Sequence, residues 1–220
     1  MSVRTRIDTI AAIATPPGTG GVGIVRVSGP EALALLKKLF QPRRPQSAFA
    51  SHHLYYGNIH ARNGAILDEV LAVYMRAPHT YTREDVVEFQ CHASPLVLQE
   101  LLEHLFTLGA RPAEPGEFTK RAFLSGRIDL SQAEAVIDLL EARSASGAGL
   151  AAAQLQGTLA REIADIRTAL IELMAQLEVA IDFPDEDADI FDRHTARNVL
   201  QECVLVPVRM LIADADHGRV

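Results

Sequence analysis

The sequence TPPGTGGVGIVRVSG, residues 15–29, decides between two folds for the first part of this chain. Gly18, Gly20 and Gly23 form a literal G-x-G-x-x-G, but such a turn binds the phosphates of a dinucleotide only where it opens a helix. The residues that follow, IVRVS at 24–28, are rich in β-branched side chains and predict a strand. Residues 9–14, TIAAIA, predict another strand before the loop. We therefore expect a strand–loop–strand unit here and no dinucleotide site.

Outward from this unit, the first 120 residues mix strands with helices. Further strands are predicted at 54–60, 66–76 and 86–92. One helix is predicted from Pro30 to about Phe40, and another follows Ser94 as N-cap with Pro95 behind it, ending near Gly109. Because the helices do not alternate regularly with the strands, we expect an α+β domain with a mixed sheet over residues 1–120.

After the Pro-rich loop at 111–116 the pattern is helical only. Residues 131–134, SQAE, fit a capping box, and an apolar series at spacings of three and four predicts a long helix that packs in a bundle. A third helix is predicted at about 193–214, kinked or shortened by Pro207. Residues 121–220 are therefore expected to form an all-α bundle segment. The apolar series consists of Leu159, Ile163, Ile166, Leu170, Leu173, Leu177 and Ile181.

Composition narrows the class of protein. Charged residues make up 22% and hydrophobic residues 48% of the 220, which is ordinary for a soluble chain. The net charge of −7 argues against a broad nucleic-acid-binding surface, which needs clustered Lys and Arg. No apolar stretch is long enough for a membrane span, and MSVRTRIDTI lacks the apolar core of a signal peptide. Cys91 and Cys203 have no C-x-x-C partner and indicate reduced thiols, so a cytoplasmic location is expected.

Two polar positions lie on otherwise apolar strands. On strand 86–92, Glu88 shares a face with Gln90 and His92, opposite Val87 and Phe89. A carboxylate there could bind a ligand edge with two N–H donors, or the face could simply be solvated. Arg26, between Val25 and Val27, could likewise meet an anionic ligand or extend its head group into solvent. The pattern alone favours the solvated alternative for both residues.

Other motifs exclude several chemistries. The acidic stretch DFPDEDAD, residues 182–189, lacks the Gly and Glu of an EF-hand loop and is interpreted as a helix stop followed by an acidic cap. The chain contains no H-E-x-x-H, no G-x-S-x-G and no G-x-x-x-x-G-K-[ST]. We therefore predict no metal site and no catalytic residues, and we expect this polypeptide alone neither to bind nor to hydrolyse GTP.

Four strings, in order, resemble the N-terminal part of the tRNA-modification GTPase family MnmE, also called TrmE. They are DTIAAIATPPGTGGVGIVRVSG, YTREDVVEFQCH, PAEPGEFTKRAFLSGRIDLSQAEAVIDLLEA and AIDFPDED, and the resemblance covers residues 8 to about 190. It implies an α+β domain similar to folate-binding domains, which forms a homodimer, and then a helical domain with an inserted G domain. Members act with the flavoprotein MnmG on the wobble uridine of tRNA, adding an aminomethyl or carboxymethylaminomethyl group.

The same resemblance implies a cofactor and its contacts. The one-carbon unit comes from a tetrahydrofolate derivative, 5-formyl- or methylene-tetrahydrofolate, while GTP, Mg²⁺ and K⁺ belong to a G domain that these residues do not include. The family's folate contacts fall on Arg26, Glu88 and Arg127, and the glycine loop is expected to shape the pocket and a dimer contact. A carboxylate can accept two N–H groups of a pterin, and Arg suits an anionic glutamyl tail.

Two departures from the family pattern qualify these expectations. Where members commonly have Cys-His-Gly-Gly, this chain has Ala93 and Ser94 in place of the glycines. The family's C-terminal Cys-x-Gly-Lys signature is missing, and Cys203 does not replace it. The alternative to a GTPase segment is a stand-alone folate-binding or scaffolding module, which the reading frame downstream of codon 220 would distinguish.

Overall fold

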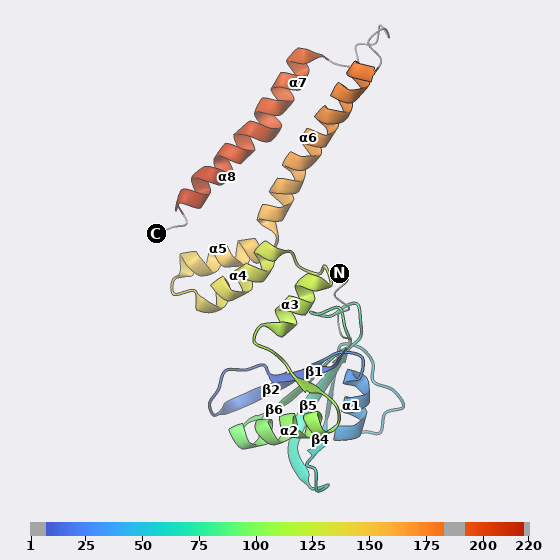
Figure 1. The fold of residues 1–220 in the computed structure, drawn as a ribbon. Coiled ribbons are helices and arrows are strands. Elements are labelled where there is room, and N and C mark those ends of the chain that lie inside the picture. Colours follow the sequence, from blue (N-terminus) through green and yellow to red (C-terminus); the bar gives the residue numbers. More distant parts are fainter. Residues whose placement is uncertain (1–7, 183–191, 218–220) are drawn as a thin grey trace. The chain divides into compact units, whose positions relative to one another are not determined.

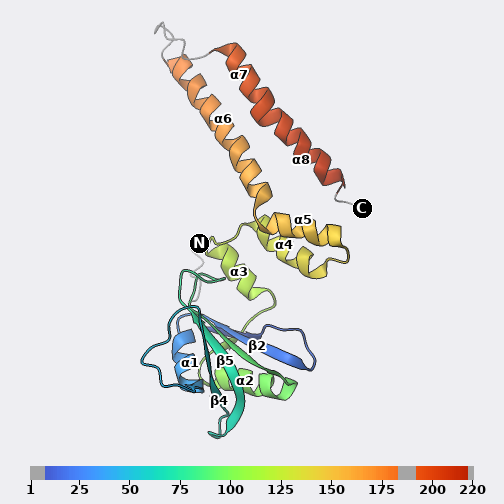
Figure 2. The same cartoon turned by 180° about the vertical axis from the view of Figure 1, so that it is seen from behind.

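The computed structural model describes residues 8–182 and 192–217, which form two compact units. The first is Met1–Ile128 and the second is Asp129–Val220. Figures 1 and 2 show a sheet with helices in the first unit and helices only in the second. The predicted class, an α+β domain followed by an all-α segment, is therefore confirmed.

A seven-stranded sheet organises the first unit. Its spatial order is β3-β4-β5-β6-β2-β1-β7, and all neighbours are antiparallel except β1 and β7, so the sheet is mixed. The strands are β1 (Ile10–Ile13), β2 (Gly20–Ser28), β3 (Phe40–Pro42), β4 (His53–His60), β5 (Ile66–Met75), β6 (Val86–Ala93) and β7 (Arg111–Pro112). β1 and β2 pair with each other across the glycine loop, which confirms the strand–loop–strand prediction.

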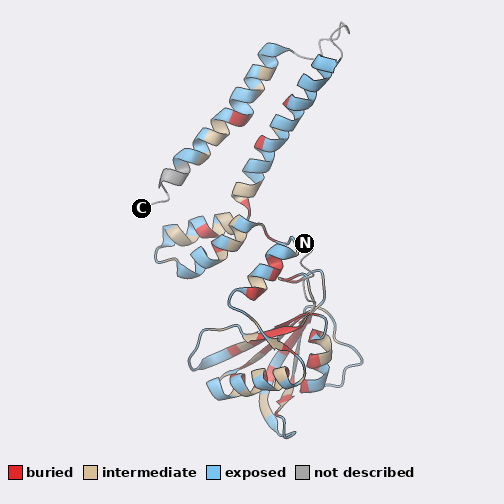
Figure 3. Ribbon diagram, in the orientation of Figure 1, coloured by how far each residue is buried: buried red, intermediate tan, exposed pale blue. Residues whose placement is uncertain are grey.

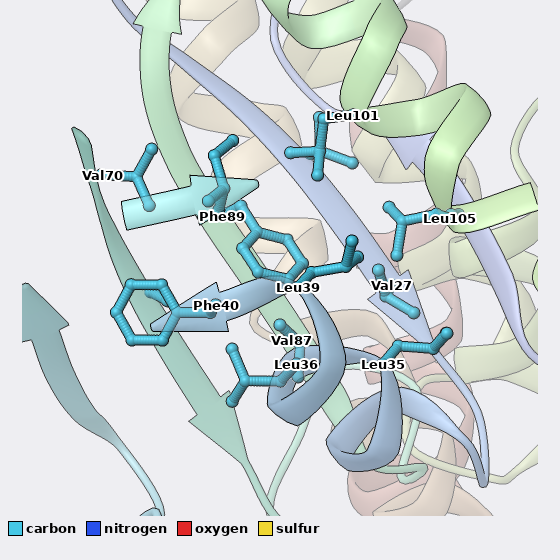
Figure 4. Packing of buried hydrophobic residues seen from close by; sticks show 14 of the residues in the cluster. Val27, Leu35, Leu36, Leu39, Phe40, Val70, Val87, Phe89, Leu101 and Leu105 are labelled. Atoms are coloured by element: carbon cyan, nitrogen blue, oxygen red, sulfur yellow. The ribbon is translucent and has the colours of Figure 1, made fainter. Parts of the chain in front are cut away.

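Two helices, α1 (Ala32–Leu39) and α2 (Pro95–Thr107), pack on one face of this sheet. Figure 4 shows Leu35 and Leu36 from α1 and Leu101 and Leu105 from α2 meeting strand residues such as Phe89. α1 begins at Ala32, two residues after Pro30, and its N-cap is Glu31. It ends at Leu39 because Phe40 turns to extended backbone and opens β3.

Gly23 of the opening motif has a packing role. A Cβ built at Gly23 would lie 2.6 Å from Cδ1 of Leu98 on α2 and 3.0 Å from the backbone Cα of Ala93 on β6. A side chain at this position would therefore be crowded, because the first turn of α2 packs directly over β2. A Cβ at Gly21, two residues earlier, would meet no atom within 4 Å.

Gly23→Ala should lower the free energy of unfolding of the first unit by about 1–3 kcal/mol, the usual cost of overpacking a core. Gly21→Ala is the matched control and should change it by less than about 0.5 kcal/mol. All four tyrosines, at 55, 56, 74 and 81, lie in this unit, so urea unfolding followed by tyrosine fluorescence reports on it. Equal stability of the two variants would contradict the packing role.

The helix α3 (Glu117–Leu124), which the sequence analysis did not predict, belongs to the first unit. The expected boundary after residue 120 would divide this helix, whereas the two units meet between Ile128 and Asp129. Buried Arg121 of α3 bonds the backbone oxygen of Asp8 at 2.9 Å and its carboxylate at 2.6 Å. Contacts so distant in sequence leave no local signal, and they attach α3 to Asp8, two residues before β1.

The second unit begins with α4 (Leu130–Glu141) and α5 (Ala145–Leu155). The predicted capping box at 131–134 is wrong: the N-cap is Asp129, whose side chain accepts from the backbone N–H of Gln132, while Gln132 bonds back to the Asp129 N–H. Asp precedes Ser131 as cap because Leu130 is already helical. No helix was predicted for α5, whose sequence ASGAGLAAAQL is rich in Ala, Ser and Gly, and Ser144 caps it.

The apolar series at 159–181 lies on a single long helix, α6 (Thr158–Asp182), as predicted. Only Ile166 and Leu173 of that series are buried, whereas Ile163, Leu177 and Ile181 are exposed (Figure 3). Most of the seam therefore remains uncovered by the described residues. The acidic stretch after Asp182 lies outside them. No helix in the described part of the chain is long and apolar enough to cross a membrane.

Pro207 does not end the last helix but changes its winding. α7 (Arg193–Val199) runs through a π-helical segment, η1 (Leu200–Leu205), into α8 (Val206–His217). Proline has no N–H and its ring would clash with the carbonyl four residues before it, that of Cys203. The wider turn accommodates the ring, and the N–H of Val206 bonds the oxygen of Gln201 instead.

Candidate functional site

Arg26 and Glu88 lie directly opposite each other on neighbouring strands. β2 and β6 are antiparallel, and their register pairs these two residues. Nε of Arg26 donates to Oε1 of Glu88 at 2.7 Å. The side chains are 31% and 16% exposed, so the pair is partly desolvated and still accessible to a ligand.

Strand alternation places this pair on the face of the sheet opposite α1 and α2. Val87 and Phe89 on β6, and Val25 and Val27 on β2, are fully buried in the core, which confirms the predicted division of the two faces. Glu88 follows as the outward residue between two buried ones. Burial of these apolar residues therefore directs Arg26 and Glu88 to the opposite face of the sheet.

The carboxylate of Glu88 keeps accepting capacity in this pair. Among the described residues, Oε2 of Glu88 has no hydrogen-bond partner, and Oε1 accepts only from Arg26. A carboxylate offers about four acceptor positions. The geometry therefore suits a ligand edge with two adjacent N–H donors, while Arg26 neutralises the charge and remains bonded.

An aromatic ring, which the sequence patterns did not predict, lies beside the Arg26–Glu88 pair. The guanidinium carbon of Arg26 lies 5.6 Å from the ring centroid of Phe118, on α3. A cation at this distance over a ring face is attracted by its quadrupole. The local sequence EFTKR does not predict this contact, because Phe118 and Arg26 are distant in sequence and meet only in the folded chain.

Arg127, the third predicted contact, does not touch the pair. It lies after α3, and its guanidinium carbon is 5.2 Å from the ring centroid of Tyr81. Tyr81 is in turn hydrogen-bonded to Thr119 of α3, with 3.1 Å between the hydroxyl oxygens. Because Phe118 and Thr119 are adjacent, α3 connects the Arg26–Glu88 pair with the Tyr81–Arg127 stack.

A cluster of ion pairs holds α3 in place. It consists of Asp8, Glu84, Arg111, Glu117 and Arg121, and we call it the α3 anchor. Arg121 bonds both oxygens of Glu84 at 3.0 Å and Oε1 of Glu117 at 3.0 Å. Arg111, on β7, donates to Glu117 at 2.6 Å and to Asp8 at 2.8 Å. The anchor joins three separate segments to one helix.

Electrostatics within the anchor strongly favour the ionised carboxylates. Hydrogen bonds from Arg111, opposed by burial and helped by the backbone N–H of Glu114 and by Arg121, lower the pKa of Glu117 from 4.5 to about 2. The pKa of Asp8 is also lowered, chiefly by its hydrogen bond to Arg111. The free energy of unfolding of the first unit should therefore decrease at acid pH as these carboxylates become protonated.

Acidification should destabilise the first unit as Glu117 protonates. A group whose folded pKa is depressed contributes fully above its unfolded pKa and loses that contribution as pH falls toward the folded value. With 4.5 unfolded and about 2 folded, Glu117 should cost the unit about 2 kcal/mol between about pH 6 and pH 3. Glu117→Gln should remove this part of the loss, as measured by urea unfolding at both pH values. An unchanged pH dependence in the variant would refute the assignment.

Ala93 and Ser94, where the resemblance predicted two glycines, lie at the end of β6. Ala93 pairs with Gly20 in the register, and Ser94 is the N-cap of α2, although its side chain makes no capping bond. His92 is held by Asp68, which accepts from both its backbone N–H and Nδ1, and this raises the His92 pKa. In the described part of the chain no three His, Cys, Asp or Glu residues cluster so as to hold a metal ion.

Two family models match the chain. Residues 9–127 match the model for the GTP-binding protein TrmE N-terminus, and residues 130–220 match the model for the MnmE helical domain. These ranges agree with the two units.

Individual relatives are similar over nearly the whole chain. The tRNA modification GTPase MnmE of Desulfotalea psychrophila is 53% identical over 97% of this chain, that of Acetivibrio thermocellus 52% over 97%, and that of Chloroflexus aurantiacus 48% over 97%. In each case the match covers 46% of the relative. The chain therefore spans about half the length of the curated relatives it matches.

Proposed function

The chain belongs to the MnmE family of tRNA modification GTPases, and from this premise we propose that it is the folate-binding, dimerising part of such an enzyme. The observation that carries the proposal is the Arg26–Glu88 pair, partly buried on the sheet face that α1 and α2 leave uncovered. A carboxylate held this way presents acceptors without an uncompensated charge.

A reduced pterin fits the donor and acceptor pattern at this pair. Its ring N–H and its amino group are adjacent donors, and Oε2 of Glu88 together with the remaining capacity of Oε1 can accept both. Phe118 adds an apolar surface beside Arg26. Arg127, beside Tyr81, is a cation for the anionic glutamyl tail.

In the full enzyme this part would supply the one-carbon unit. We propose that a 5-formyl- or methylene-tetrahydrofolate bound here serves the modification of the tRNA wobble uridine, carried out in the cytoplasm with an MnmG-like flavoprotein. GTP hydrolysis, with Mg²⁺ and K⁺, would reside in a G domain outside these residues. The residues of this chain bind and orient the folate; they perform no phosphoryl transfer.

Calorimetric titration of the 220-residue chain with 5-formyltetrahydrofolate tests the proposal. Binding with a dissociation constant on the order of micromolar is expected from one bidentate charged contact and one buried aromatic ring system. Titration with GTP and Mg²⁺ should give no heat of binding. A flat folate titration with correctly folded protein would refute the proposed function.

A homodimer formed through the first unit is the second part of the proposal. Beyond the Arg26–Glu88 pair, the same sheet face carries the exposed apolar side chains of Leu54, Tyr56 and Leu71. Light scattering should give twice the chain mass at about 50 µM, a concentration at which a specific interface persists. Leu54→Lys together with Leu71→Lys should give a monomer. A monomeric parent protein would contradict this part of the proposal.

A further inference from the structure

A cavity of about 460 Å³ lies beside Arg127, distinct from the Arg26–Glu88 pair. Its lining includes two guanidinium groups, Arg83 and Arg127, and two imidazoles, His52 and His79. No carboxylate lines it. A concave site with two permanent positive charges and no negative one attracts anions.

Two residues with a strained backbone conformation line the same cavity. Among the described residues, the non-glycine residues with positive φ are His52, at 62°, and Arg83, at 60°, and both line the cavity. This conformation costs a side-chain-bearing residue roughly 1 kcal/mol and persists only where the surroundings impose it. Residues held in such conformations are found at ligand sites and switch regions, where the surrounding structure keeps them in place.

The surroundings do impose these conformations. The His52 N–H donates to the oxygen of Tyr74, and the His52 Nδ1 is bonded to Oγ of Ser51 at 2.8 Å. Nη1 of Arg83 donates to the backbone oxygen of Ser125 at 3.0 Å. That bond attaches the Arg83 loop to the turn that carries Arg127, so both guanidinium groups are positioned on one cavity.

We propose that this cavity is a subsite for a polyglutamate tail, so that the protein prefers folates carrying several γ-linked glutamates. The inference rests on the proposed folate site and names a finer specificity of it. Each added glutamate contributes one carboxylate, and two Arg side chains can pair with successive carboxylates by charge-assisted bonds. Small volume and the net charge of −7 favour a short flexible anion over an extended nucleic-acid backbone.

A series of contacts through α3 links the Arg26–Glu88 pair to the cavity. Phe118 lies beside Arg26, the adjacent Thr119 bonds Tyr81, and Tyr81 stacks on Arg127, which lines the cavity. A pterin at Glu88 would leave its tail free to follow this line. The subsite therefore contacts the part of the ligand that carries no one-carbon chemistry.

Calorimetry with 5-formyltetrahydrofolate bearing one and five glutamates tests the proposal. The parent chain should bind the pentaglutamate about three- to fivefold more tightly, a size set by the additional solvent-accessible ion pair at Arg83. The ratio should fall to about twofold or less in Arg83→Gln and return in Arg83→Lys, which keeps the charge. Arg62→Gln, whose parent side chain pairs with Glu103 on α2, is the control and should keep the full ratio.

The outcomes separate the subsite from the proposed function. If both folates bind equally tightly to the parent chain, the subsite is wrong while folate binding stands. If neither binds, both proposals fail. An unchanged ratio of the two folate affinities in Arg83→Gln would also overturn the subsite. If that variant keeps the ratio but loses binding to a short single-stranded RNA, the cavity binds nucleic acid and not a glutamate tail.

Discussion

Glu88→Gln should weaken binding of 5-formyltetrahydrofolate by about 30- to 1000-fold, or roughly 2–4 kcal/mol. The amide keeps the size of the side chain but replaces an acceptor with a donor that faces a donor of the pterin. It also removes the charge that Arg26 now contacts at 2.7 Å. The effect should exceed that of an ordinary lost hydrogen bond because the group is only 16% exposed.

Glu69→Gln is the matched control for that change. Glu69 lies on β5 and is 47% exposed, with a distant ion partner, Arg43, at 3.8 Å. Its variant should bind folate within about twofold of the parent, since exposed pairs contribute little. Tyrosine fluorescence verifies that both variants are folded. If Glu88→Gln binds folate as tightly as the parent does, Glu88 belongs to a merely solvated strand face.

Arg121→Met should lower the free energy of unfolding of the first unit by about 3–5 kcal/mol, the cost of leaving buried charges without their partner. Methionine replaces the aliphatic part of the side chain, so the loss reports on charge more than on packing. Asp8, Glu84 and Glu117 would then face one another with only Arg111 remaining from the α3 anchor. Urea unfolding followed by tyrosine fluorescence measures the change.

Lys120→Met, one residue earlier on α3, controls for removing a positive charge. Lys120 is 65% exposed and lies 3.8 Å from Glu114, so its variant should change stability by less than about 0.5 kcal/mol. A loss below about 1 kcal/mol in Arg121→Met would show that the anchor does not hold α3.

The elements that short-range patterns describe were predictable, and those that depend on distant partners were not. Alternation at 86–92 predicted both the strand and the outward direction of Glu88, because successive side chains on a strand point to opposite faces whatever surrounds them. The spacing at 159–181 predicted α6 in the same way. The misplaced capping box shows where this fails: Ser131 and Asp129 are both acceptable caps by residue type, but α4 begins at Leu130, which makes Asp129 the N-cap.

The candidate site, too, was predictable from the sequence only in part. The sequence by itself determined that Arg26 and Glu88 lie on strands with apolar neighbours. The resemblance of four strings to a known family added the prediction that both residues contact one ligand together with Arg127. Only the tertiary structure decided that β2 and β6 are neighbours in the register that pairs them, and that α3 places Phe118 beside Arg26 and Thr119 within hydrogen-bond distance of Tyr81. The physical reason is distance along the chain: Arg26 and Glu88 are 62 residues apart, and Asp8 and Arg121 are 113 apart. Pairings over such separations are chosen by the burial of whole strands and helices, which no local pattern records.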